Sequence, residues 1–147
     1  MAKTLQKTYF ALVVPAIVLS AGLFVLQYFG LREGSDELPS RFLMISVFVA
    51  AITAGAALPI FLRALFFGKA KEKGYVTPEE FLKHQKTIIF IISIPLYLAF
   101  FAAYSGFETF YFGGTALAAI YAAYYHFPSE KKIAFDKKVF MVKDESR

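Results

Sequence analysis

The chain contains four long runs of residues without a charged side chain, and polar segments separate these runs. They cover residues 8–31, 42–62, 87–107 and 109–129. A helix needs about 20 apolar residues to cross the roughly 30 Å of hydrocarbon in a bilayer, which is close to the length of each run. The sequence therefore predicts an all-α integral membrane protein with four transmembrane helices in an antiparallel bundle and a short cytoplasmic tail. We expect the helices over about 8–29, 41–67, 78–106 and 109–127, and the tail over 128–147.

The composition agrees with a membrane protein. Hydrophobic residues make up 58% of the 147 residues and aromatic residues 18%, and the mean hydropathy is +0.54. Soluble domains have a lower apolar fraction, about 45–50%. We interpret residues 1–147 as one membrane domain.

The central polar segment, residues 63–86, contains the clearest local signals. Gly74 follows a lysine-rich stretch and is suited to the left-handed residue that ends a helix. Thr77, Pro78 and Glu80 form the pattern of a capping box, so the next helix should begin at Pro78. The first turns of that helix carry an apolar side, which we expect to pack on the C-terminal tail or on lipid headgroups; the alternative is a docking surface for a partner. This side is formed by Phe81, Leu82, Gln85, Ile88 and Ile89.

The basic residues predict the orientation. All lysines and arginines except Arg32 and Arg41 flank the same ends of the four runs. The positive-inside rule then places both termini and the central segment in the cytoplasm, with the acidic loop that contains Glu33, Asp36 and Glu37 outside. A net charge of +5 in this distribution favours anionic lipids at the cytoplasmic face as partners, and not nucleic acid.

The second and fourth runs are rich in small residues, whereas the first and third are bulky and contain Pro15 and Pro95. Small residues spaced four apart allow two membrane helices to approach closely. We therefore predict that the second and fourth helices touch, and that the chain consists of two similar tandem hairpins. The predicted packing residues are Ala50, Ala51, Ala54, Gly55, Gly114, Ala118 and Ala122.

The interiors of the four runs contain no ionisable acid or base, although proton-coupled carriers and membrane enzymes usually have one. The chain also lacks cysteine, and we recognise no metal-ligand spacing and no catalytic residues. We therefore expect a non-catalytic accessory or scaffold subunit that assembles with itself or with other membrane subunits. A small channel or lipid transporter is the first alternative.

The second alternative is a subunit of a membrane redox complex that binds a quinone or haem b. His84 and His126 lie at the cytoplasmic ends of two helices expected to be antiparallel, and should therefore have similar depths. Histidine is a common axial ligand of haem, and phenol, imidazole or guanidinium groups can bind a quinone headgroup. The candidate residues for such a site are Arg63, His84, Tyr124, Tyr125 and His126.

Overall fold

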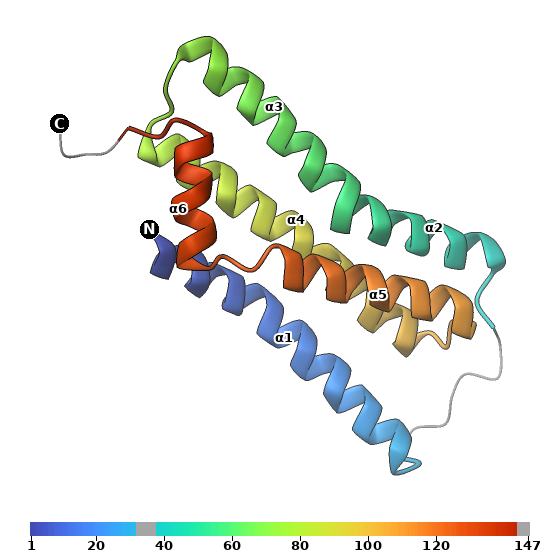
Figure 1. The fold of residues 1–147 in the computed structure, drawn as a ribbon. Coiled ribbons are helices and arrows are strands. Elements are labelled where there is room, and N and C mark those ends of the chain that lie inside the picture. The colour runs from blue at the N-terminus through green and yellow to red at the C-terminus, as the bar shows by residue number, and fades with distance from the viewer. Residues whose placement is uncertain (32–37, 144–147) are drawn as a thin grey trace.

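The computed structural model of the protein describes residues 1–31 and 38–143 (Figure 1). These residues form α1 (Ala2–Tyr28), α2 (Arg41–Ile52), the π-helical turn η1 (Thr53–Ala57), α3 (Leu58–Lys73), α4 (Pro78–Tyr104), α5 (Thr109–Tyr125) and α6 (Glu130–Val139). The described ranges contain no strand beyond one isolated bridge between Val76 and Val142. The predicted acidic loop with Glu33, Asp36 and Glu37 lies outside the described residues, as do residues 144–147.

The prediction of an all-helical chain with apolar helices long enough to cross a membrane is confirmed. Within residues 1–31 and 38–143, three helices meet this description: α1, the continuous helix Arg41–Lys73, and α4. Helix α5 has 17 residues and is shorter than these three. The fourth crossing therefore stays a prediction.

Several predicted helix ends differ from the structure. The first helix begins at Ala2, before residue 8, because lysine is a good helix former and a helix can continue outside the apolar run. The second helix passes residue 67 and Gly68 and ends at Gly74, whose φ of 76° is the left-handed conformation that glycine tolerates. Helix α4 begins at Pro78 with the predicted capping box. It ends at Tyr104 and α5 ends at Tyr125, each two residues earlier than predicted.

The continuous helix Arg41–Lys73 contains the turn η1 because of Pro59. Proline has no N–H group, so the carbonyl four residues earlier, that of Gly55, loses its helical donor. The Leu58 N–H donates instead to the carbonyl of Thr53, five residues earlier, which is the spacing of a π-helix. The helix adjusts locally at this proline and does not end.

Helix α4 is the centre of the bundle. It packs against α1, α5 and the helix formed by α2, η1 and α3. Figure 1 shows α1 and α3 on opposite sides of the α4–α5 pair. The two halves therefore pack differently: α4 and α5 form a hairpin through a tight turn at Gly106 (φ 67°), whereas α1 and α2 are separated by that hairpin.

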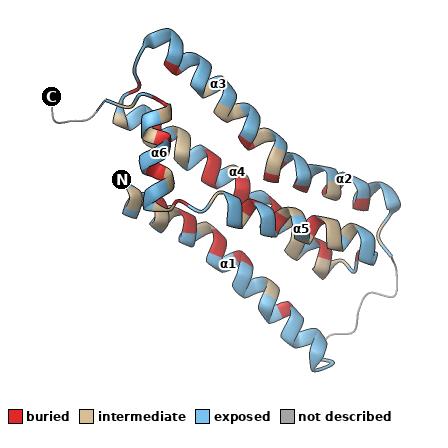
Figure 2. Cartoon of the chain, viewed as in Figure 1, coloured by how far each residue is buried: buried red, intermediate tan, exposed pale blue. Residues whose placement is uncertain are grey.

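The outward surface of the bundle is apolar. Figure 2 shows buried residues on the helix sides that face α4 and exposed residues on the outer sides of α1, α2 and α3. Many exposed side chains are large and hydrophobic, including Phe24, Phe42, Phe61, Phe90, Phe110 and Leu117. Such a surface is stable when lipid covers it.

The C-terminal tail forms helix α6 across one end of the bundle (Figure 1). The sequence predicts only a short tail over residues 128–147, without this helix. The Ser129 side chain caps this helix, and its buried side consists of Ile133, Asp136 and Phe140. Phe140 lies 6.1 Å from Phe81 between ring centroids, and both side chains are buried. The apolar side of the first turns of α4 thus packs on the protein's own tail.

Candidate functional site

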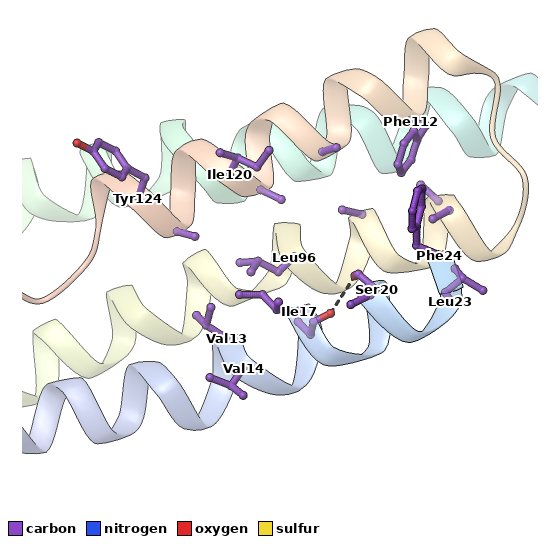
Figure 3. A pocket seen from close by; sticks show the side chains of 18 of the residues that line it. Val13, Val14, Ile17, Ser20, Leu23, Phe24, Leu96, Phe112, Ile120 and Tyr124 are labelled. Carbon is purple, nitrogen blue, oxygen red and sulfur yellow. Dashed lines mark hydrogen bonds between the residues drawn. The ribbon is translucent and has the colours of Figure 1, made fainter. Parts of the chain in front are cut away.

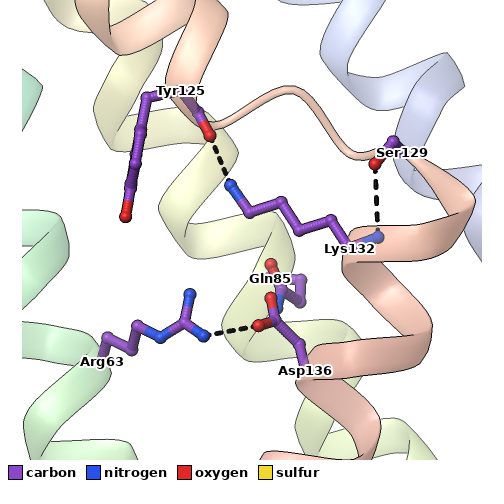
Figure 4. A network of polar contacts seen from close by, with 6 residues as sticks. All are labelled: Arg63, Gln85, Tyr125, Ser129, Lys132 and Asp136. Carbon is purple, nitrogen blue, oxygen red and sulfur yellow. Dashed lines mark hydrogen bonds and ion pairs between the residues drawn. The ribbon is translucent and has the colours of Figure 1, made fainter.

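A cluster of polar side chains lies between α6 and the ends of α3, α4 and α5. We call Arg63, His84, Gln85, His126, Lys132 and Asp136 the polar cluster, because they line one small cavity. Its central member is Asp136, which is 2% exposed. One carboxylate oxygen accepts a hydrogen bond from the Arg63 guanidinium at 2.5 Å, and the other accepts one from the Gln85 amide at 3.1 Å (Figure 4). A buried carboxylate is tolerated only with such partners, so these contacts fix α6 to α3 and α4.

His84 is held between aromatic rings. Its imidazole stacks on Phe66 with ring centroids 4.0 Å apart and planes 3° apart, and its edge faces Phe140 at 6.0 Å. The Arg63 guanidinium also lies over Phe140, 5.4 Å from the ring centroid. These contacts restrict the orientation of the His84 ring.

His126 lies one residue beyond α5, and its Nε2 atom is buried without a hydrogen-bond partner among the described residues. Burial, followed by the charges of Lys132 and Arg63, lowers the pKa of His126 to about 4. The imidazole is therefore neutral near pH 7. The cavity that it lines has a volume of about 30 Å³, which is space for about one water molecule.

Lys132 connects α6 to the end of α5. Its ammonium group donates a hydrogen bond to the Tyr125 carbonyl at 2.5 Å and lies 4.9 Å from the centroid of the Tyr125 ring (Figure 4). Burial is the main cause of a lowered pKa of Lys132. The carbonyl at the end of α5 and the aromatic face both favour a cation at this position.

The structure brings together only some of the residues predicted for a cofactor site. Arg63, His84 and His126 lie in the polar cluster, and Tyr125 borders it through its contacts with Lys132. Tyr124 is 86% exposed and lines a different surface. The space between the two histidines is far smaller than a haem, and His84 is stacked on Phe66, so this arrangement does not favour the haem alternative.

Three members of the polar cluster were not predicted: Gln85 as a polar ligand, Lys132 and Asp136. One feature of the sequence could have indicated that Asp136 is buried. Asp136 lies on the same helical face as Ile133 and Phe140, with spacings of three and four. A carboxylate on the apolar face of a helix requires a cationic partner, although the sequence does not show that this partner is Arg63.

A second, larger feature is an apolar groove of about 1080 Å³ between α1 and α5, with α4 as its floor (Figure 3). We call it the α1/α5 groove. Two of its polar side chains are satisfied within the protein: the Tyr9 hydroxyl donates to the Ala123 carbonyl at 2.7 Å, and the Ser20 hydroxyl donates to the Ala16 carbonyl at 2.8 Å. Small residues line the groove from α4, the turn after it and α5: Ala99, Ala102, Ala103, Gly106, Ala116, Ala119 and Ala123.

The residues predicted for helix packing are distributed as follows. Ala51, Ala54, Gly55 and Ala122 are buried, Gly114 and Ala118 are half-buried, and Ala50 is exposed. A Cβ atom added at Gly55 would lie 3.1 Å from the Ala118 carbonyl oxygen, so η1 and α5 approach backbone to backbone. Ala50 lies about 100° around the helix from Ala51, which turns it away from this contact.

Comparisons with models of known protein families, with curated proteins and with solved structures find no match to this chain. Within residues 1–31 and 38–143, no group of three or more histidine, aspartate or glutamate side chains is arranged to hold a metal ion.

Proposed function

We propose that the protein crosses the membrane four times, with both termini on the cytoplasmic side. The short α5 runs beside α4 and would form the fourth crossing. One end of the bundle contains the N-terminus, the lysine-rich end of α3, the start of α4 and α6 (Figure 1). By the positive-inside rule, this supports a cytoplasmic location for that end.

Single cysteines test this topology, because the chain has no cysteine of its own. A cysteine at Glu108, in the turn between α4 and α5, should react with a membrane-impermeant maleimide added to intact cells. A cysteine at Lys71 should react only after the cells are opened. The reverse pattern would contradict the orientation. A cysteine at the exposed Lys138 of α6 lies beyond α5 and should also react only after the cells are opened; its labelling in intact cells together with Glu108 would contradict the fourth crossing.

We further propose that the protein is a non-catalytic accessory subunit that holds an apolar transmembrane helix of a partner membrane protein in the α1/α5 groove. The groove itself is the observation that carries this proposal. Its small residues would allow a helix to approach α4 and α5 closely, and its lining contains no carboxylate, histidine, lysine or arginine. In the polar cluster, in contrast, Arg63 and Gln85 occupy the Asp136 carboxylate, and the cavity has space for about one water molecule.

Crosslinking in native membranes tests the partner. Ala103→Cys and Ala116→Cys place thiols in the groove, and Ile60→Cys places one on the exposed outer side of α3 as a control. A short bifunctional thiol-reactive or photoreactive reagent should join the groove cysteines, and not the control, to one other membrane protein. A crosslinked band at twice the mass of the chain would identify the partner as a second copy. Equal crosslinking from Ile60→Cys would contradict a specific role of the groove.

One alternative occupant is favoured by the size of the groove, which is near the upper end of the about 300–1,000 Å³ typical of ligand sites. A lipid transporter or a quinone-binding subunit would hold an acyl or isoprenoid chain there, with Tyr124 at the rim. Mass spectrometry of protein purified in mild detergent distinguishes a bound lipid or quinone from a partner helix. A stoichiometric lipid or quinone that is lost in Ala116→Phe would support the ligand and contradict the partner helix.

A further inference from the structure

A basic cleft of about 330 Å³ lies between α3 and α4, on a different side of the bundle from the α1/α5 groove. Lys69 and Lys73 of α3 and Lys83 of α4 line it, above a base formed by Phe66, Ala70 and Val76. Lys69 and Lys73 are one helical turn apart on α3, so the two helices contribute three lysines to the lining of one space.

The charge of this basic cleft is unbalanced. Among the described residues that line it, Glu80 is the one carboxylate, and it pairs with Lys73 at 3.0 Å. Neither Lys69 nor Lys83 has an ion pair within the part of the chain that the structure describes. Two cations therefore remain for a ligand. Thr87 lines the same space, and its hydroxyl donates to the Lys83 carbonyl at 3.0 Å.

The position of the cleft relates it to the membrane surface. Thr87 is the first residue of the charge-free run 87–107, so the cleft lies where α4 leaves the hydrocarbon. Beyond Thr87, the same side of α4 carries Phe90, which is 61% exposed, and the same side of α3 carries the exposed Leu65 one turn before Lys69. A ligand with a negatively charged head and apolar chains would match both parts of this surface.

We propose that the basic cleft binds the phosphate group of an anionic phospholipid, whose acyl chains lie along Leu65 and Phe90. Lysines attract anionic headgroups at a membrane surface, and their ammonium groups donate hydrogen bonds to phosphate oxygens. The exposed apolar residues beside the cleft argue for a lipid over a free phosphate ion. The site is independent of the proposed occupant of the α1/α5 groove.

The experiment titrates the purified full-length protein, in a non-ionic detergent, with short-chain phosphatidylglycerol and counts bound lipid by native mass spectrometry. Phosphatidylcholine of the same chain length and inorganic phosphate are the comparison ligands. The variant Lys69→Gln/Lys83→Gln removes the two lysines of the cleft that have no ion pair among the described residues. Lys131→Gln/Lys138→Gln removes two exposed lysines of α6 as a matched control.

We expect phosphatidylglycerol to bind more tightly than phosphatidylcholine. The cleft variant should lose about five-fold in affinity per lysine, or about 25-fold in total, while the control changes by less than about twofold. Equal losses in both variants would overturn the site, as would equal binding of phosphatidylcholine. Displacement of the lipid by inorganic phosphate at similar concentrations would overturn the assignment to a lipid. Matching melting curves show that both variants are folded.

Discussion

Two regions of the bundle differ in whether the chain itself fills the space between its helices. Beneath α6, the polar cluster is closed: Asp136 is paired with Arg63 and Gln85, and Phe140 and Phe81 are buried. Between α1 and α5, in contrast, an apolar groove of about 1080 Å³ stays open. Closing the first region needs specific partners because a buried charge without a partner is costly, whereas the second is stable in lipid without them. The α1/α5 groove is therefore open to a partner helix or an apolar ligand, whereas the polar cluster is filled by the chain itself.

The largest expected effect compares one phenylalanine from each region. Phe140 is 1% exposed and Phe24, which lines the groove, is 69% exposed. Phe140→Ala should lower the free energy of unfolding by about 3–5 kcal/mol, because it leaves a cavity under α6. Phe24→Ala should lower it by less than about 1 kcal/mol, since lipid or detergent refills the space. Denaturant unfolding in detergent measures both, and equal losses would contradict the contrast between a closed and an open region.

The next prediction removes the ion pair of the polar cluster. Arg63→Met leaves the buried Asp136 carboxylate with Gln85 as its one hydrogen-bond partner among the described residues, and should destabilise the protein by about 2–3 kcal/mol. This value is below the full range for a buried pair because the Arg63 side chain is 40% exposed. Lys71→Met, at an exposed position of α3, is the control. If the two variants unfold alike, the pair does not hold α6 in place.

A smaller effect is expected at the contact that positions α5 as one wall of the groove. Gly55→Ala places a methyl group 3.1 Å from the Ala118 carbonyl oxygen, so α5 must shift, and we expect a loss of about 1–2 kcal/mol. Gly113→Ala makes the same change where no atom lies within 4 Å of the added carbon, and it should be neutral or slightly stabilising. Thermal unfolding of the two variants provides the comparison. A Gly55→Ala protein as stable as Gly113→Ala would show that close backbone contact is not required there.

The smallest effect concerns the dependence of the closed region on pH. The folded-state pKa of His126 is about 4, below the usual 6.5, so the unfolded chain binds a proton more readily between these values. The contribution of neutral His126 to stability is complete above about pH 6.5 and is lost as the pH falls toward 4. After allowance for partial exposure we expect a loss of about 1 kcal/mol. His126→Gln should flatten this part of the stability profile; an unchanged slope would mean that other groups cause it.

Part of the polar cluster could be predicted from the sequence. Arg63, His84 and His126 were selected because they lie at the same ends of apolar helices, and helix geometry places them at similar depth. Asp136, which completes the cluster, lies in the tail, and its position depends on how α6 crosses the bundle. The groove was not predicted, because it arises from the separation of α1 and α5, which the pattern of either helix alone does not contain.

The sequence by itself determined the features that depend on local chemistry. Apolar runs specified the long helices, the capping box specified the start of α4 at Pro78, and Gly74 specified the end of α3, because each depends on neighbouring residues. Only the tertiary structure decided that the α4–α5 hairpin lies between α1 and α2, that Asp136 meets Arg63, and that a groove stays open. Lipid surrounds every apolar helix face equally well, so the apolar pattern does not select the neighbour; contact shape and the pairing of a buried charge do.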